Sequence, residues 1–282
     1  PAGDTVDVVH GETIPDPYRW LEDGNSAETR SWTGQQNALT EAYLAARPAR
    51  AVIRSRLDQL LAIGAISVPV PARGHYFYQR RDGRQNQPVL YVRDGADGAD
   101  RVLVDPNLLD AGGTVALDWY YPSEDGKLLA YGLSEDGSEQ SILHLLDVGT
   151  GQPLPDRIPH TRSADLAWLP DGSGFYYTRY PAPGEVPEGE EHYHRSIFLH
   201  LIGADPSRDT LVFKPARKEY WPGVELSSDG RWLLISVSRT FDETDRYIRN
   251  LHTGGPLVPV AEDIAASFEG VVVRGRLFLR TN

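Results

Sequence analysis

From residue 66 onward, short runs of apolar residues follow tight turns that end in glycine. The run at residues 128–131 follows Asp125-Gly126, and the run at 232–235 follows Asp229-Gly230. Asp-Gly suits such a turn because glycine accepts a positive φ and the aspartate bonds its own backbone. The five turns are Arg73-Gly74, Asp125-Gly126, Asp171-Gly172, Asp229-Gly230 and Arg274-Gly275.

A second apolar strand follows each of the first four turns at a steady offset, and a short closing strand comes after it. These second strands are expected at residues 89–91, 142–146, 197–201 and 247–251. The repeat is therefore a four-stranded unit of about 50 residues, which is the signature of a β-propeller blade. A β-sandwich would also contain hairpins, but two matched features at a fixed offset favour the propeller. The predicted fold is mainly β, with blades 1–4 and the start of a fifth in residues 66–282.

Residues 1–65 follow a helical pattern instead. Asn25 is the expected N-cap of a first helix, with Glu28 completing a capping box. Apolar residues then recur at helical spacing until Pro48, which opens a second helix that Gly64 ends. Each helix carries a single apolar stripe, so each is predicted to pack on another part of a protein.

The connections between strands are predicted to differ between the two faces of the propeller. Turns after first strands are tight, whereas the longer connections follow second and fourth strands, such as 181–194 and 105–115. Loops that do not pack in the core often contain the binding residues, so the face with the longer loops is the expected functional face. Tyr120, Trp221 and Phe241 fall near it, either as packing between blades or as a wall for an apolar or proline-bearing ligand.

Composition narrows the classes of function. The 282 residues include 28 Lys and Arg against 40 Asp and Glu, a net charge of −12, which argues against nucleic acid as a partner. No apolar run is long enough to predict a membrane span. With no cysteine, the chain has no disulfide, thiolate metal site or cysteine nucleophile. We expect a cytoplasmic monomer without a cofactor, or a periplasmic or secreted one if a signal has been removed.

Two segments bear on catalytic or metal chemistry. Residues 190–194 place two histidines beside two glutamates, but in an acidic loop rich in Pro and Gly, so no metal is predicted. Ser173 lies between two glycines in a hairpin turn, and the Gly-x-Ser-x-Gly of a nucleophile elbow occurs nowhere. The sequence therefore contains no complete catalytic constellation.

The segment Asp-Pro-Tyr-Arg-Trp-Leu-Glu-Asp at residues 16–23 resembles the start of the prolyl oligopeptidase family of serine peptidases. Further matching segments are residues 104–107, 133–138, 167–177 and 225–231. The resemblance runs from His10 to the last residue. It implies a seven-bladed propeller that caps an α/β-hydrolase domain, with the catalytic Ser, Asp and His beyond residue 282.

The resemblance also implies the substrate and the roles of particular residues. Members hydrolyse short peptides on the carboxyl side of proline, and the propeller restricts substrate size. Pro222 and Phe241 fall where relatives meet substrate side chains, and Ser163 falls where relatives often carry an aromatic. The candidate residues of the substrate cavity are Ser163, Trp221, Pro222 and Phe241. In the N-terminal arm, Asp16, Tyr18, Arg19, Trp20 and Glu22 would fasten residues 1–65 to the hydrolase domain.

Two other functions remain open at this point. The first is a non-catalytic propeller that acts as a binding module, which the unpartnered stripes of the two helices disfavour. The second is a related peptidase of the oligopeptidase B, dipeptidyl or acylaminoacyl type, which the arm segment disfavours.

Overall fold

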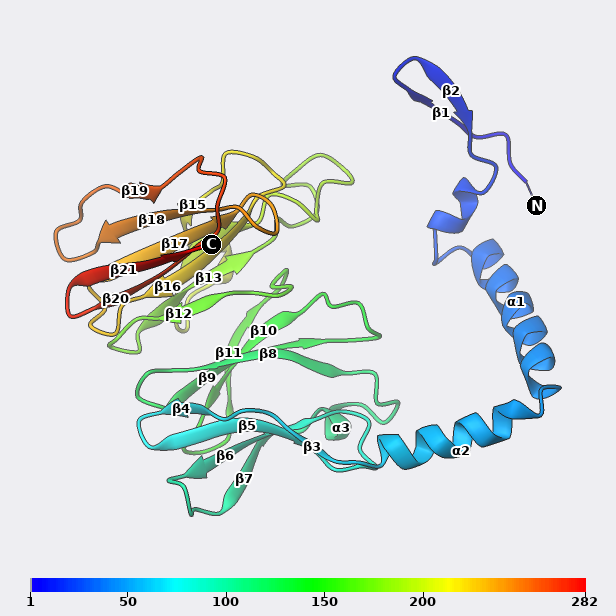
Figure 1. Cartoon of the computed structure of the whole chain (residues 1–282), viewed down its shortest axis with the longest axis horizontal. Helices are drawn as coiled ribbons and strands as arrows, with labels where there is room; N and C mark the ends of the chain where they lie inside the picture. The colour runs from blue at the N-terminus through cyan, green and yellow to red at the C-terminus, as the bar shows by residue number, and fades with distance from the viewer. Residues whose placement is uncertain (1) are drawn as a thin grey trace. The chain divides into compact units, whose positions relative to one another are not determined.

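The computed structural model describes residues 2–282, which form two compact units. The first ends at Ile63 and the second is Gly64–Asn282 (Figure 1). The first unit contains β1 (Val6–Val9), β2 (Glu12–Pro15), the 3-10 helix η1 (Arg19–Glu22), α1 (Ala27–Ala45) and α2 (Ala49–Leu61).

The start of α1 differs from the sequence prediction. The cap is Ser26, whose Oγ accepts the N–H of Thr29 at 3.1 Å, so the capping box at Asn25 and Glu28 is wrong. Asn25 has other partners: its N–H donates to Asp23, and its side-chain oxygen accepts from Arg30. These bonds hold Asn25 in the preceding turn and leave the next residue to cap the helix. Pro48 does precede α2, as predicted.

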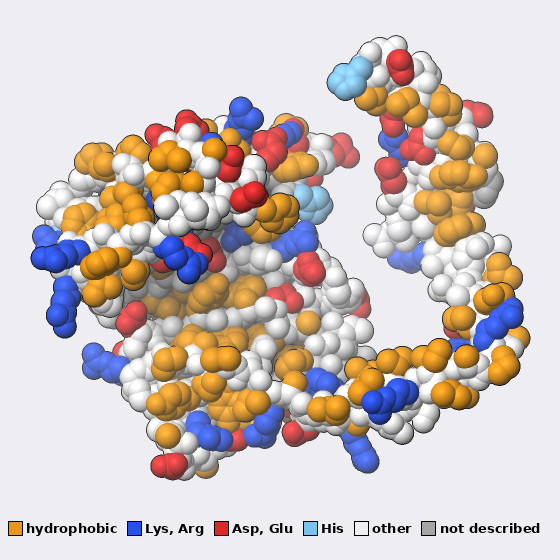
Figure 2. Space-filling view, in the orientation of Figure 1, with side chains coloured by type: hydrophobic (Ala, Val, Ile, Leu, Met, Phe, Trp, Pro, Cys, Tyr) orange, Lys and Arg blue, Asp and Glu red, His pale blue; other side chains and the backbone are white. Residues whose placement is uncertain are grey.

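The apolar stripes of α1 and α2 are exposed in this structure. Leu39 and Tyr43 on α1, and Val52, Ile53 and Leu57 on α2, are all exposed. Figure 2 shows hydrophobic side chains along both helices. An exposed apolar surface of this extent is typical of a site that packs against another part of a protein.

The second unit consists of successive antiparallel sheets. The first contains β3 (Ala65–Ile66), β4 (Val70–Ala72), β5 (His75–Arg81), β6 (Val89–Asp94) and β7 (Asp100–Val104), and the second contains β8 (Ala116–Pro122), β9 (Leu128–Ser134), β10 (Ile142–Asp147) and β11 (Pro153–Ile158). The third contains β12 (Leu166–Trp168), β13 (Gly174–Arg179), β14 (Ser196–Leu201) and β15 (Thr210–Phe213), and the fourth contains β16 (Trp221–Leu226), β17 (Trp232–Ser238), β18 (Thr244–Asn250) and β19 (Val258–Ala261). The hairpin of β20 (Phe268–Val273) and β21 (Arg276–Thr281) follows, and α3 (Pro106–Leu109) and η2 (Pro206–Arg208) lie in connections.

The second, third and fourth sheets are meanders in which every strand pairs with the next one along the chain. The first sheet is the same four-stranded unit with a broken first strand, because β3 and β4 both pair with β5. Pro69 lies in the break, where it has no N–H to give to the ladder. The predicted repeat of four strands is therefore confirmed for blades 1–4, and β20–β21 begins a fifth.

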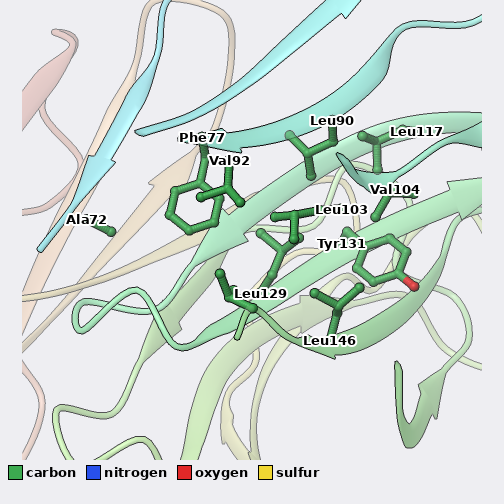
Figure 3. Packing of buried hydrophobic residues seen from close by; sticks show 11 residues of the cluster. Ala72, Phe77, Leu90, Val92, Leu103, Val104, Leu117, Leu129, Tyr131 and Leu146 are labelled. Atoms are coloured by element: carbon green, nitrogen blue, oxygen red, sulfur yellow. The ribbon is translucent and has the colours of Figure 1, made fainter. Parts of the chain in front are cut away.

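Apolar side chains fill the space between neighbouring sheets. Between the first and second sheets, Phe77 and Leu90 meet Leu129 and Leu146, and all four are at most 3% exposed (Figure 3). Similar clusters join the second sheet to the third and the third to the fourth. Tyr120 packs against the first cluster, so it belongs to the packing between blades. This face-to-face stacking of sheets is the architecture of a β-propeller.

The Asp-Gly turns explain why the repeat is regular. In the second blade, Ser123 Oγ donates to Asp125 Oδ1 at 2.8 Å and accepts the N–H of Leu128 at 3.0 Å. Ser227 makes the same two bonds in the fourth blade. Gly126 has φ 71°, a conformation that other residues rarely adopt. The serine, aspartate and glycine together fix where the second strand begins.

Gly132 is expected to be essential to the second blade. A Cβ on this residue would lie 2.3 Å from a ring carbon of Trp119, which is held by a bond from its indole N–H to Thr161 O at 3.1 Å. We expect Gly132→Ala to lower the free energy of unfolding by about 1–3 kcal/mol through overpacking. Gly255→Ala is the control, because its Cβ would make only an ordinary contact. Calorimetry of both variants measures the effect, and equal stabilities would contradict it.

Candidate functional site

Because consecutive strands of each sheet are antiparallel, the connections after second and fourth strands all lie at the same face of the propeller. We call this face the loop-rich face. The longest of them, residues 180–195, joins β13 to β14, and residues 105–115 join β7 to β8. The opposite face carries mostly short turns. Two longer connections lie on the opposite face, residues 202–209 with η2 and residues 251–257, so the prediction that the longer connections lie on one face is only partly correct.

Three of the four candidate cavity residues lie on the loop-rich face. Ser163 precedes β12 and is exposed, Trp221 begins β16 and is 51% exposed, and Phe241 lies in the connection after β17 and is fully exposed. Pro222 is different: it is buried within β16 opposite Val237. Its side chain contributes packing, whereas the other three are open to a ligand.

The structure brings Ser163 and Trp221 together through Arg195, which the sequence analysis missed. Arg195 is 4% exposed, and its Nη2 donates to Ser163 O and to Thr178 Oγ1, each at 2.7 Å. The carbon of its guanidinium lies 5.2 Å from the centre of the Trp221 ring and 5.9 Å from that of Tyr180. We call these five residues the Arg195 cluster.

The backbone of the Arg195 cluster is held under strain at Ser163. This residue has φ 47°, in the left-handed region, and His160 three residues earlier has φ 63°. Such conformations persist only where the surroundings fix them, and they concentrate at functional sites. Here Thr161 is fully buried and its Oγ1 donates to Ser141 O at 2.9 Å, while Arg195 holds the carbonyl of Ser163. The segment is therefore a rigid part of the loop-rich face.

The half-buried Asp165 adjoins the Arg195 cluster, because its backbone N–H donates to Thr178 Oγ1 at 2.9 Å. Burial raises the pKa of Asp165, and the positive charge of Arg195 opposes that rise. Its Oδ2 would lie 2.5 Å from a Cβ on Gly223, so this position of β16 accepts only glycine without displacement. Burial also raises the pKa of Tyr121 to about 12, and Asp165 adds to the effect. The tyrosine is thus a neutral donor that bonds Ala164 O at 3.1 Å.

Phe241 is presented by a loop that Arg239 stabilises. Arg239 pairs with Asp245 at 3.2 Å and with Glu243 at 3.4 Å, and it donates to Ile264 O at 2.6 Å. Its backbone N–H donates to Glu243 O at 2.9 Å, which closes the loop. Phe241 itself makes no packing contact that reduces its exposure. An exposed aromatic on a fixed loop is a typical anchor for a ligand.

The longest connection, residues 180–195, is fastened near its end by charges. Glu190 accepts from Lys218 Nζ and pairs with His194 Nε2, both at 2.7 Å. The carboxylate of Glu190, considered above as a metal ligand, is therefore paired with Lys218. Within residues 2–282, no three His, Asp or Glu side chains gather in a group that could hold a metal ion.

A cavity of about 730 Å³ runs between the innermost strands of the four sheets. Ala72, Tyr121, Ala167 and Val224 line it, one from each sheet. A propeller has such a channel on its axis because its blades are arranged radially. Ser173 does not face it, since Ser173 lies in the β12–β13 turn and bonds Asp171, as expected of a hairpin serine.

The arm residues form a network of their own in the first unit. Arg19 bonds Asp7 of β1 and pairs with Asp16 at 2.5 Å and with Glu22 at 3.4 Å. Trp20 packs edge-on against Trp32 of α1, with ring centres 6.1 Å apart, while Tyr18 is exposed. The segment therefore ties the β1–β2 hairpin to α1 within the arm.

The architecture defines a β-propeller domain with one loop-rich face. Its sequence matches, over residues 2–282, the family model described as the prolyl oligopeptidase N-terminal β-propeller domain. The chain belongs to this family. No helix within the described residues is long and apolar enough to cross a bilayer.

Relatives and solved structures agree with this assignment. The chain is 30% identical to the prolyl endopeptidases of Elizabethkingia meningoseptica, over 90% of this chain and 36% of the relative, and of Elizabethkingia miricola, over 98% and 39%. A solved structure from a study of two prolyl endopeptidases and their inter-domain dynamics matches with a TM-score of 0.90 and 31% identity, over 99% of this chain and 42% of that one. The chain thus spans well under half the length of these relatives.

Proposed function

We propose that this chain is the propeller of an enzyme that hydrolyses short peptides on the carboxyl side of proline. The observation that carries the proposal is the family match over residues 2–282, together with relatives that are prolyl endopeptidases. Bond cleavage would occur in an α/β-hydrolase domain of the same protein, by a serine nucleophile with a histidine base. The propeller would admit only short, unfolded peptides to that domain.

The two units would contribute to this enzyme in different ways. The exposed apolar stripes of α1 and α2 would pack on the hydrolase domain, because they have no cover in the structure described here. The loop-rich face would meet the peptide through Ser163, Trp221 and Phe241. An alternative, a binding module without catalysis, is compatible with the propeller alone but leaves these helix stripes unexplained.

Hydrolysis of paired reporters tests the proposal. The complete enzyme is expected to release a chromophore from succinyl-Gly-Pro at a far higher kcat/KM than from succinyl-Gly-Ala, and to cleave a short proline peptide but not the same sequence within a folded protein. Equal rates on the two reporters would contradict proline specificity. Cleavage of the folded protein would contradict restriction by size, and no hydrolysis of either reporter would favour the binding module.

A further inference from the structure

We propose that Arg195 is the positioning residue that joins Trp221 and the Ser163 backbone into one rigid wall for the peptide. The inference rests on the proposed function, since it assigns this wall to the peptide substrate. Arg195 is itself buried, so it acts through Trp221 and Ser163 and does not touch the peptide. Its guanidinium group holds the Trp221 ring and the Ser163 carbonyl in place.

The first step is the orientation of Trp221. This residue begins a strand, is half exposed, and belongs to none of the apolar clusters between the sheets. The guanidinium of Arg195 lies 5.2 Å from the centre of its ring, within the range of a cation–π interaction. Arg195 therefore lies against a ring that the core leaves partly unsupported, while the exposed part of the ring remains available to a ligand.

The second step is the carbonyl of Ser163. The left-handed φ of this residue costs free energy, and its carbonyl accepts from Arg195 Nη2 at 2.7 Å. The same nitrogen donates to Thr178 Oγ1, whose oxygen also accepts the N–H of Asp165. Arg195 thus links the segment before β12, strand β13 and the first residue of β16 in one network.

The third step is the state of Arg195 itself. Its Nε is buried without a hydrogen-bond partner, which is costly for a charged group. A protein with an apolar residue in place of a buried charge is often equally stable. The burial of Arg195 is therefore only weak evidence that this residue serves stability alone. No other side chain supplies a planar cation that can lie near the Trp221 ring and donate to a backbone carbonyl at the same time.

The experiment compares Arg195→Met, which keeps the apolar stem, and Arg195→Lys, which keeps the charge, in the complete enzyme. On a peptide that extends on both sides of the proline, we expect Arg195→Met to raise KM about five- to tenfold with kcat unchanged. Arg195→Lys is expected to recover part of this loss. The short succinyl-Gly-Pro reporter is expected to show a clearly smaller increase in KM than the extended peptide.

A double-mutant cycle with Trp221→Ala makes the test independent of overall folding. Trp221 is half exposed, so its truncation is expected to preserve the fold, and Arg195→Met should add little to the KM increase of Trp221→Ala. Additive effects, or equal losses on the short reporter, would overturn the positioning role. If the unmodified enzyme shows no preference for proline, the proposed function fails instead. In that case a shift of the Trp221 indole N–H resonance in Arg195→Met still tests the contact, and an unshifted resonance would overturn it.

Discussion

Replacement of His200 by glutamine is expected to lower the free energy of unfolding by about 3–5 kcal/mol, the usual cost of breaking a buried ion pair. His200 on β14 is fully buried between two carboxylates. Its Nε2 lies 3.0 Å from Asp156 Oδ1 in the second blade, and its Nδ1 lies 2.8 Å from Asp209 Oδ1 in the third. Tyr177 donates to the other oxygen of Asp209 at 2.6 Å. Glutamine would leave two buried carboxylates without a cation at the junction of two blades.

The same contacts make the stability depend on pH. Burial acts to lower the pKa of His200, but hydrogen bonds to Asp209 and Asp156 outweigh it and raise the pKa above the ordinary 6.5. The charged imidazole therefore stabilises the fold fully below pH 6.5, and this contribution is lost as the pH rises through the raised pKa. Tyr177 and Arg179 are the other ionisable groups of this site, and burial raises the pKa of Tyr177, so it stays neutral throughout. We expect unfolding scans from about pH 6 to about pH 9 to show this loss in the unmodified protein and its absence in His200→Gln.

His144 offers a matched control with the opposite sign. It stacks on Tyr131 in the second blade, and burial together with Arg157 lowers its pKa to about 4. Neutral in the fold, it makes stability fall as the pH drops from 6.5 toward 4. His144→Gln should thus remove part of the acid sensitivity and leave the alkaline loss in place. If both variants change the same side of the pH profile, the charge assigned to His200 is wrong.

The blades could be read from the sequence because their signals are local. In the second and fourth blades the serine, aspartate and glycine of the turn lie within a few residues of one another, so the sequence alone shows where the next strand begins. The helix cap shows the limit of this approach, since Asn25 and Ser26 are both good caps and bonds to Asp23 and Arg30 decide between them. The sequence pattern alone could not decide between these two neighbouring residues as the N-cap of α1.

The long-range contacts of the blades and of the loop-rich face could not be predicted from the sequence. Arg195 bonds a carbonyl 32 residues away, and His200 bonds a carboxylate 44 residues away. Neither pair has a spacing that any local motif produces. A charged histidine within the apolar strand Ser196–Leu201 was a signal that a buried partner exists, but it does not say which aspartate. Ser163 and Phe241 came from the family resemblance, and Trp221 from its position near the longer loops. The geometry separates these three from the buried Pro222.

Replacement of Arg239 by methionine is expected to lower both the stability of the fourth blade and the affinity for peptide. The side chain of Arg239, 12% exposed, supplies the cation beside Asp245, whose side chain is 6% exposed. Because Asp245 would keep its charge without that cation, we expect a loss of about 3 kcal/mol. The loop of Phe241 would also lose the bonds from Arg239 to Glu243 and to Ile264 O, so the ring would no longer be held in one place.

Phe241→Ala separates the two effects. The Phe241 side chain is fully exposed, so its removal should leave the unfolding temperature unchanged, yet raise KM for an extended peptide if the ring meets the substrate. Leu201→Ala removes a half-exposed apolar side chain at the opposite end of a blade, and it should change neither quantity. Calorimetry and steady-state kinetics on the three variants measure the outcome. A rise in KM for Leu201→Ala, or none for Phe241→Ala, would place the peptide away from the loop that Arg239 stabilises.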